Sequence, residues 1–284
     1  MAVRILTDSA SDISQKKAGE WNIHVIPLRV RFSEEEYYDG VTLPPHDFYE
    51  KLIETDVIPK TSQITPFEYE KEFAKAKEDG DQLLCFTMSS GVSGCWQSAC
   101  LAAEEYKDCV TVIDTRQFCI SQYIVVERAV QLRDRGYSAK EIAETIEKEK
   151  NDAHVISVFN TLEYLKLSGR ISSVAAYAGE MLSIKPVVTI ENGVVKVIGK
   201  ARGSKKSNNL LTETVRKLGI DFDRPLCLGY TGTSDELLKK YVRDSEELYE
   251  GHEDCLQVVE VGATIGTYAG PGAIALAFFS KNHG

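Results

Sequence analysis

The segment VVTIENGVVKVI, residues 187–198, decides which kind of sheet the second half of this chain can form. Two runs rich in valine and isoleucine flank Asn192 and Gly193. An Asn-Gly pair between two such runs is typical of a tight turn that joins antiparallel strands. A sheet made only of parallel strands contains no such hairpin, because parallel strands need a long crossover. The second half is therefore predicted to carry a mixed sheet.

Outside the hairpin, short apolar runs alternate with helical patterns. Thr65, followed by Pro66 and Glu68, predicts a capped helix start, and residues 138–141 and 233–236 repeat the capping pattern. Strands that alternate with helices imply α/β layers with mainly parallel strands. The expected strands lie at residues 3–6, 24–30, 83–86, 110–113, 155–159, 226–229, 258–261 and 273–279.

We therefore predict an α/β protein of two domains, divided near residue 155. The first domain, residues 1–155, is expected to have a mainly parallel sheet, and the second, residues 156–284, a mixed sheet with helices. A chain of 284 residues is long enough for each of two such domains to bury a core.

The composition disfavours several classes of protein. The chain is 43% hydrophobic and 27% charged, and its formal net charge of −10 opposes binding to nucleic acid or to an anionic membrane. The longest apolar run, residues 273–279, is too short for an integral membrane segment. The 7 cysteines form no Cys-x-x-Cys pair, so we expect a reduced protein in the cytoplasm without a bound metal.

Loops rich in hydroxyl side chains and glycine follow many of the expected strands. Ligands of open α/β sheets bind beyond the carboxyl ends of the strands, so these loops are predicted to gather at one polar site. Any single loop is explained as well by helix capping and turn formation. The loops lie at residues 6–12, 86–94, 112–118, 158–164, 229–235 and 261–272.

The loop SSGVSG, residues 89–94, is the most informative of them. A phosphate-binding P-loop needs a lysine after its last glycine, and none follows Gly94. A nucleophile elbow around Ser93 needs glycine where Cys95 stands. What remains is a loop of hydroxyls and amides at an expected helix start, which suits an anionic oxygen without further chemistry.

Several such stretches together resemble the DegV family of bacterial fatty-acid-binding proteins. They occur in the family's order and cover nearly the whole chain, and the ordered set is more specific than any one of them. The stretches are TDSASD at 7–12, PKTSQ at 59–63, SSGVSG at 89–94, DT at 114–115, residues 162–172 with SGR at 168–170, KP at 185–186, Arg202 and GPG at 270–272.

The resemblance implies a non-catalytic carrier that holds one long-chain fatty acid, such as palmitate, stearate or oleate, between its domains and uses no cofactor. Hydroxyls that match Thr61 and Ser93 hold the carboxylate in the family, and Arg170 matches a position near it. Arg202 matches, more loosely, a surface that docks a fatty-acid kinase, which converts the bound acid to an acyl phosphate. The supporting loops contain Ser62, Gly94 and Gly270.

One departure from the family's pattern bears directly on the head group, besides a second at Cys95 and Trp96. The family often has histidine two residues before the GPG loop, where this chain has Tyr268. A phenol donates one hydrogen bond but carries no positive charge near neutral pH. Either Tyr268 replaces the histidine as a neutral donor to the carboxylate, or this protein handles the head group differently.

Two other functions stay open from the residues alone. An enzyme acting on a small carboxylated or phosphorylated metabolite would use Asp8, Asp12 or Asp114 as acid–base groups, although we favour helix capping as the role of Asp8 and Asp12. An interaction protein would use the basic stretch at residues 200–206 to dock an acidic partner.

Overall fold

The computed structural model describes residues 2–55, 57–170 and 184–281, and its first half is built on a parallel sheet. The strand order is β2-β1-β6-β7, and each neighbouring pair is parallel. The four strands are β1 (Val3–Asp8), β2 (His24–Ile26), β6 (Gln82–Thr87) and β7 (Val110–Asp114). This arrangement confirms the parallel sheet expected from the alternating strand and helix patterns.

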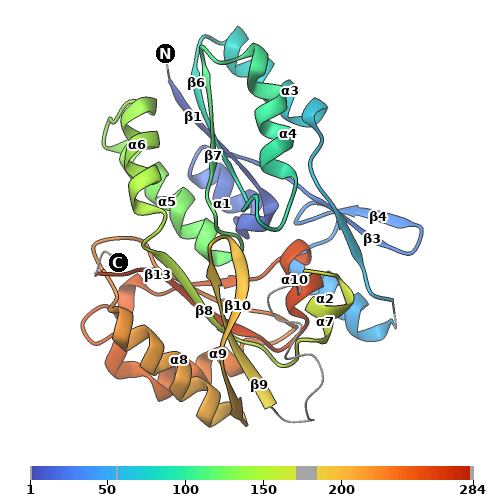
Figure 1. Ribbon diagram of the computed structural model, residues 1–284, viewed down its shortest axis with the longest axis vertical. Coiled ribbons are helices and arrows are strands. Elements are labelled where there is room, and N and C mark those ends of the chain that lie inside the picture. The colour runs from blue at the N-terminus through green and yellow to red at the C-terminus, as the bar shows by residue number, and fades with distance from the viewer. Residues whose placement is uncertain (1, 56, 171–183, 282–284) are drawn as a thin grey trace.

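Helices cover both faces of the parallel sheet (Figure 1). Ile5, Leu84 and Phe86 point to one face, where they pack with α5 (Ile120–Asp134) and α6 (Ala139–Glu149). Leu83 and Cys85 point to the other face, where they pack with α3 and α4. Successive residues of a strand face opposite sides, so a strand covered on both faces is apolar throughout. The helices of this half also include α1 (Gln15–Glu20), η1 (Ser9–Ser11), α3 (Pro66–Glu78), α4 (Cys95–Ala102) and η2 (Ala103–Glu105).

The second half carries the predicted mixed sheet. Its order is β10-β9-β8-β13-β11-β12, in which β9 and β10 are antiparallel and β11 and β12 are parallel. The turn at Asn192 and Gly193 joins β9 to β10, which confirms the hairpin. The strands are β8 (Ala153–Val158), β9 (Ile184–Glu191), β10 (Val194–Arg202), β11 (Cys227–Tyr230), β12 (Gln257–Glu260) and β13 (Ile274–Phe279).

Helix α5 packs between the two large sheets. Its buried residues share one core with β1 and β6 of the first sheet and with β8, β11 and β13 of the second. The opposite face of the mixed sheet is covered by α8 (Ser204–Leu218) and α9 (Glu236–Asp244). Two short turns of helix follow, η4 (Glu246–Leu248) and η5 (Glu253–Cys255). No helix of the described part of the chain is long and apolar enough to cross a membrane.

A small antiparallel sheet lies beside the first half and was not predicted. Its order is β4-β3-β5, from β3 (Arg29–Phe32), β4 (Glu35–Tyr38) and β5 (Lys60–Ser62). The single strand expected at residues 24–30 was wrong: the chain leaves β2 before Pro27 and enters β3 at Arg29, because proline cannot donate to a ladder. The sheet packs near α2 (Pro45–Glu54), α7 (Glu163–Leu167) and α10 (Ala263–Ala269).

Two of the three predicted helix caps are present. Thr65 and Ser138 each form a capping box with the glutamate three residues later. The third was wrong: α9 begins at Glu236 with Asp235 as its N-cap, so the helix starts two residues later than a cap at position 233 requires. There the backbone N–H of Glu236 donates instead to Ser234 Oγ at 3.3 Å.

The turn of the hairpin touches the first half of the chain. Ser89 Oγ donates to the carbonyl of Gly193 at 2.7 Å, and the Nη2 of Arg116 donates to the carbonyl of Asn192 at 3.1 Å. Figure 1 shows the turn between β9 and β10 reaching the parallel sheet near β7. The loop at residues 89–94, called the serine loop below, therefore contacts the turn between β9 and β10.

Candidate functional site

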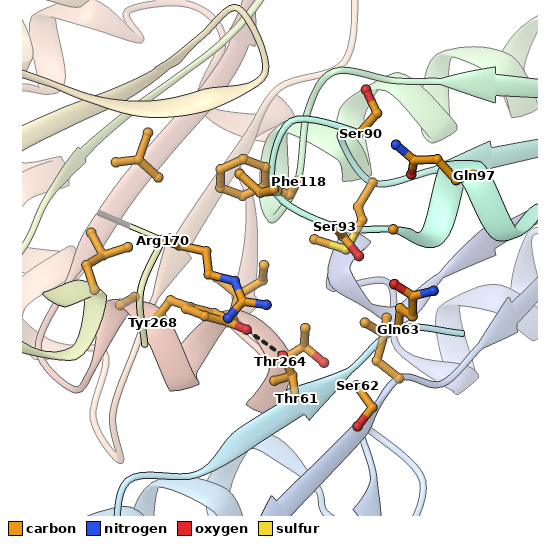
Figure 2. Close-up of a pocket in the computed structure, with 18 of the residues that line it drawn as sticks. Thr61, Ser62, Gln63, Ser90, Ser93, Gln97, Phe118, Arg170, Thr264 and Tyr268 are labelled. Carbon is orange, nitrogen blue, oxygen red and sulfur yellow. Dashed lines mark hydrogen bonds between the residues drawn. The ribbon is translucent and has the colours of Figure 1, made fainter. Parts of the chain in front are cut away.

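A cavity of about 550 Å³ opens where β5, the serine loop and α10 meet. Figure 2 shows Ser93 on one side of this space and Thr61, Tyr268 and Arg170 on the other. The polar lining residues are Thr61, Ser62, Gln63, Ser90, Ser93, Gln97, Arg170, Thr264 and Tyr268. The structure thus brings together four residues that the sequence singled out for the head group, from segments up to two hundred residues apart.

Thr61 and Tyr268 are joined by a short hydrogen bond. Thr61 stands opposite Val30 in the β3–β5 pair, which turns its side chain towards α10. Its Oγ1 lies 2.5 Å from the phenol oxygen of Tyr268. No strand was predicted at residues 60–62, but antiparallel pairing with β3 makes them a strand and fixes Thr61 at the cavity.

Arg170 brings a positive charge to the same end. Its guanidinium carbon lies 5.4 Å from the centre of the Tyr268 ring, and an Nη1 donates to the carbonyl of Ser168 at 2.9 Å. Among the described residues that line the cavity, Arg170 is the only charged one. A cation over an aromatic face is favourable, so Tyr268 helps to hold Arg170 beside the hydroxyls.

Ser93 faces the cavity from the start of α4. The helix begins at Cys95 with Gly94 as its N-cap, and Ser93 Oγ accepts the backbone N–H of Cys95 at 3.3 Å. The other end of the loop is anchored by Asp114, which accepts Ser90 Oγ at 2.6 Å. Asp114 therefore shapes the loop and does not line the cavity.

The two glycines predicted as supporting residues do different things. A Cβ at Gly94 would collide with the side chain of Gln63, so glycine lets β5 and the serine loop approach closely. Gly270 has a φ of +66° and its missing Cβ faces the ring of Tyr164. It ends α10 and lies behind the cavity, outside its described lining.

Buried carboxylates of the first half hold the start of α10. Asp12 Oδ1 accepts the backbone N–H of Gly262 at 2.9 Å, and the two oxygens of Asp39 accept those of Ala263 and Thr264 at 2.9 and 3.2 Å. Burial raises the pKa of both acids. Asp12 thus satisfies the free amides of a helix 250 residues away, and the expectation that it caps its own neighbouring helix was wrong.

Asp8 is also part of the framework. It accepts the backbone N–H of Met88 at 2.7 Å and a Gln122 Nε2 at 3.2 Å, and it makes no side-chain cap on Ser9–Ser11. Burial raises the pKa of Asp8 to about 6, although those donors oppose the rise. Neither Asp8 nor Asp12 lines the cavity.

A second, dry cavity of about 60 Å³ continues from the first. Five residues line both, namely Phe118, Phe159, Val195, Ile265 and Ala269. Beyond them the walls are formed mainly by apolar side chains of the mixed sheet, including Val155, Val188, Ile274 and Ala275. The polar end therefore leads into an apolar arm that reaches the second half of the chain.

The sequence analysis did not identify the residues of this arm. Phe118 and Phe159 lie in the loops at 112–118 and 158–164, which were singled out for their hydroxyls and not for these rings. Apolar residues at strand ends look the same whether they face a core or a cavity. Arg202 lies at the exposed end of β10, outside the described lining. Within the described ranges, no group of three or more His, Cys, Asp or Glu is arranged to hold a metal ion.

Comparison with known proteins gives matches over nearly the whole chain. A family model described as an uncharacterised protein of the DegV family matches residues 2–281. A DegV domain-containing protein from Caldanaerobacter subterraneus subsp. tengcongensis is 31% identical over 283 residues, which covers 98% of this chain and 99% of that protein. One from Deinococcus radiodurans is 33% identical over 279 residues and covers 98% of each.

Solved structures match the fold equally well. A DegV family protein from Thermus thermophilus, described by its fatty-acid binding, is 31% identical with a TM-score of 0.88, covering 99% of this chain and 100% of that one. A stearic acid-binding protein from Eubacterium ventriosum is 26% identical with a TM-score of 0.86, covering 99% of each chain.

Proposed function

This chain belongs to the DegV family, and we propose that it binds one long-chain fatty acid between two domains, residues 1–155 and 156–284. The observation that carries the proposal is a polar cavity end, with hydroxyls and one cation, that continues into a dry apolar arm. The relatives from Thermus thermophilus and Eubacterium ventriosum, which are described as binding fatty acids, support it.

The apolar arm supplies most of the affinity. Removing an acyl chain from water is favourable by about 0.8 kcal/mol for each buried CH₂. The lining of the arm is mainly apolar, and the hydroxyls of Ser157 and Thr231 within it already take part in hydrogen bonds of the fold. Palmitate, stearate and oleate are the expected ligands. Phe118 and Phe159 stand where the two cavities meet, so the acyl chain passes between the polar end and the arm beside these rings.

The polar end receives the carboxylate. Thr61, Ser93 and Tyr268 are neutral hydroxyl donors, and Arg170 supplies a positive charge. Ser62 lines the same side of the cavity. Gly94 has no side chain to meet Gln63, so this side of the cavity lies close to the serine loop. Tyr268 takes the place of the family's histidine as a neutral donor, so the net charge of the site comes from Arg170 alone among the described lining residues.

A carrier fits the lining better than an enzyme does. The described lining contains no histidine, aspartate, glutamate, lysine or cysteine to act as a base or nucleophile beside the hydroxyls. The three carboxylates considered for catalysis each accept hydrogen bonds elsewhere in the fold. The proposed role of this chain is therefore to hold and present the acid.

A fatty-acid kinase is the proposed partner. The kinase would transfer a phosphoryl group from ATP to the carboxylate held at the polar end, which gives an acyl phosphate and ADP. Arg202, exposed at the end of β10, is the proposed docking residue. This role rests on the family pattern and on the charge of the 200–206 stretch in an otherwise acidic chain.

Titration of the delipidated protein with palmitate, stearate and oleate tests the binding proposal. We expect saturable binding of one chain per protein, and no binding of any of the three would contradict it. The kinase proposal is tested separately with Arg202→Ala and the charge-matched control Lys140→Ala, whose side chain is 85% exposed on α6. Arg202→Ala should slow phosphorylation of the bound acid by a purified fatty-acid kinase, and only an unchanged rate would remove Arg202 from the docking surface.

A further inference from the structure

Thr264 shares one face of α10 with Tyr268. The two residues are four positions apart, which places their side chains one above the other on a helix. Both line the cavity, and Figure 2 shows Thr264 beside Thr61 and Tyr268. Thr264 falls in the hydroxyl-rich stretch 261–272 that the sequence analysis noted, but it was not named there as a head-group residue.

The hydroxyl of Thr264 is buried without a hydrogen-bond partner. The side chain is 1% exposed, and among the described residues no atom accepts from or donates to its Oγ1. Asp39 is the nearest acceptor, and the Thr264 side chain is the largest of the influences that lower the pKa of this acid against the larger rise caused by burial, but no hydrogen bond of ordinary geometry joins the two side chains. A buried hydroxyl without a partner is unfavourable, so its persistence at a ligand cavity points to a partner in the bound state.

Its neighbour Thr267 shows the contrast on the same helix. Thr267 is also 1% exposed, but its Oγ1 donates to the carbonyl of Ala263 at 2.9 Å and it is not part of the described lining. Thr267 is therefore satisfied within α10. The backbone of Thr264 is also fixed, because its N–H donates to Asp39. The hydroxyl of Thr264, in contrast, remains able to donate to a ligand in the cavity.

The hydrogen-bond count at the polar end leaves room for a further donor. In the Thr61–Tyr268 bond one hydroxyl donates to the other, so the pair keeps only one hydrogen for a ligand. Ser93 supplies a second if its hydroxyl turns to the ligand from Cys95 Sγ, to which it donates at 3.2 Å. An ionised carboxylate accepts about four hydrogen bonds, so beside these hydroxyls and the N–H groups of Arg170 it can still accept from a further hydroxyl.

Resting on the proposed function, we propose that Thr264 donates a hydrogen bond to the carboxylate of the bound fatty acid, as a third hydroxyl donor beside the Thr61–Tyr268 pair and Ser93. The helix start that positions it is fixed by Asp39, so the donor is already oriented before the ligand arrives. Preorganised donors lose little freedom on binding and contribute more to affinity.

The test compares stearate with stearyl alcohol in wild type, Thr264→Val, Thr264→Ser and the control Thr267→Val. Thr264→Val should weaken stearate binding by about tenfold, as expected for one lost bond to a charged group, and change alcohol binding by less than about threefold. Thr264→Ser and Thr267→Val should bind stearate within about threefold of wild type.

The other outcomes distinguish failure of the donor role from failure of the proposed function. If wild type binds stearate and Thr264→Val binds it equally well, the donor role is wrong while the proposed function stands. If Thr264→Val loses both ligands alike, the residue serves packing and the donor role is wrong. If wild type binds neither ligand, the proposed function itself fails. Should Thr264→Val not fold, Thr264→Ala measured with the same ligand pair decides between these outcomes.

Discussion

Thr61 and Tyr268 meet through a 2.5 Å hydrogen bond, although 207 residues separate them in the chain. One residue comes from the edge strand β5 and the other from the last helix, α10. The bond joins the small antiparallel sheet of the first half to the helix that the buried carboxylates hold in place. The polar end of the cavity is therefore a junction between distant segments of the chain.

Removing a hydroxyl that donates to the ligand's carboxylate should weaken fatty-acid binding without unfolding the protein. We expect Thr61→Ala and Ser93→Ala each to lower fatty-acid affinity by about tenfold, because each loses roughly one hydrogen bond to a charged group. Calorimetric titration with oleate measures the change. Thr111→Ala, which removes an exposed hydroxyl on β7, is the control. Wild-type affinity in both site variants would mean that the carboxylate lies elsewhere.

Changing Tyr268 to the family's histidine should make binding depend on pH. Below about pH 6.5 a histidine is protonated and adds a second positive charge near Arg170, so Tyr268→His should bind oleate more tightly as the pH falls from about 8 to 6. The variant Tyr268→Phe, which has neither the hydroxyl nor a titrating group, should bind about tenfold more weakly than wild type at every pH. A flat profile for Tyr268→His would place the head group away from position 268.

Narrowing the apolar arm should select for shorter acids. Ala275 lines the dry cavity from β13, so Ala275→Val places extra volume where the end of a long chain lies. We expect stearate affinity to fall by about tenfold and decanoate affinity to stay within about twofold. Ala277→Val, two residues along the same strand but outside the described lining, controls for overpacking. An equal loss for both acids would argue that the acyl chain does not enter this arm.

The buried Asp8 should make stability fall as the pH rises. Burial raises its pKa to about 6 in the folded chain, whereas an exposed aspartate titrates near 4. Between about pH 4 and 6 the folded protein therefore binds more protons than the unfolded chain, and the contribution of Asp8 to the free energy of unfolding is lost as the pH rises through this window.

Asp8→Asn isolates this contribution from the other carboxylates. The variant should be more stable than wild type at pH 7, on the order of 2 kcal/mol, and the difference should vanish below about pH 4. Denaturant unfolding at several pH values measures it, with the exposed Asp254→Asn as control. A variant that is less stable than wild type at pH 7 would show that hydrogen bonds from Met88 and Gln122 outweigh the cost of burying the charge.

The local patterns of the sequence predicted most of the large sheets. The Asn-Gly turn, the apolar runs and the boxes at Thr65 and Ser138 depend on neighbours within a few residues, and the structure confirms them. The edge strand at residues 60–62 was missed because its three polar residues carry no strand pattern. It exists through pairing with β3, which no local rule reports.

The candidate site, too, was predicted only in part from the sequence. Thr61, Ser93, Arg170 and Tyr268 were found through the family pattern, and the structure gathers them around one cavity. The contact of Asp12 with Gly262 spans 250 residues and has no local signal, so its capping role was assigned to the wrong helix. The rings of Phe118 and Phe159 look like core residues until the cavity between them and α10 is known.

The measurement that tests the central claim most directly is mass spectrometry of an organic extract of the purified protein. Fatty-acid binding predicts a long-chain acid of one or a few species, close to one acyl chain per protein chain, and its length reports the reach of the apolar arm. An extract without any acyl chain, from protein that also takes up no added oleate, would contradict the account.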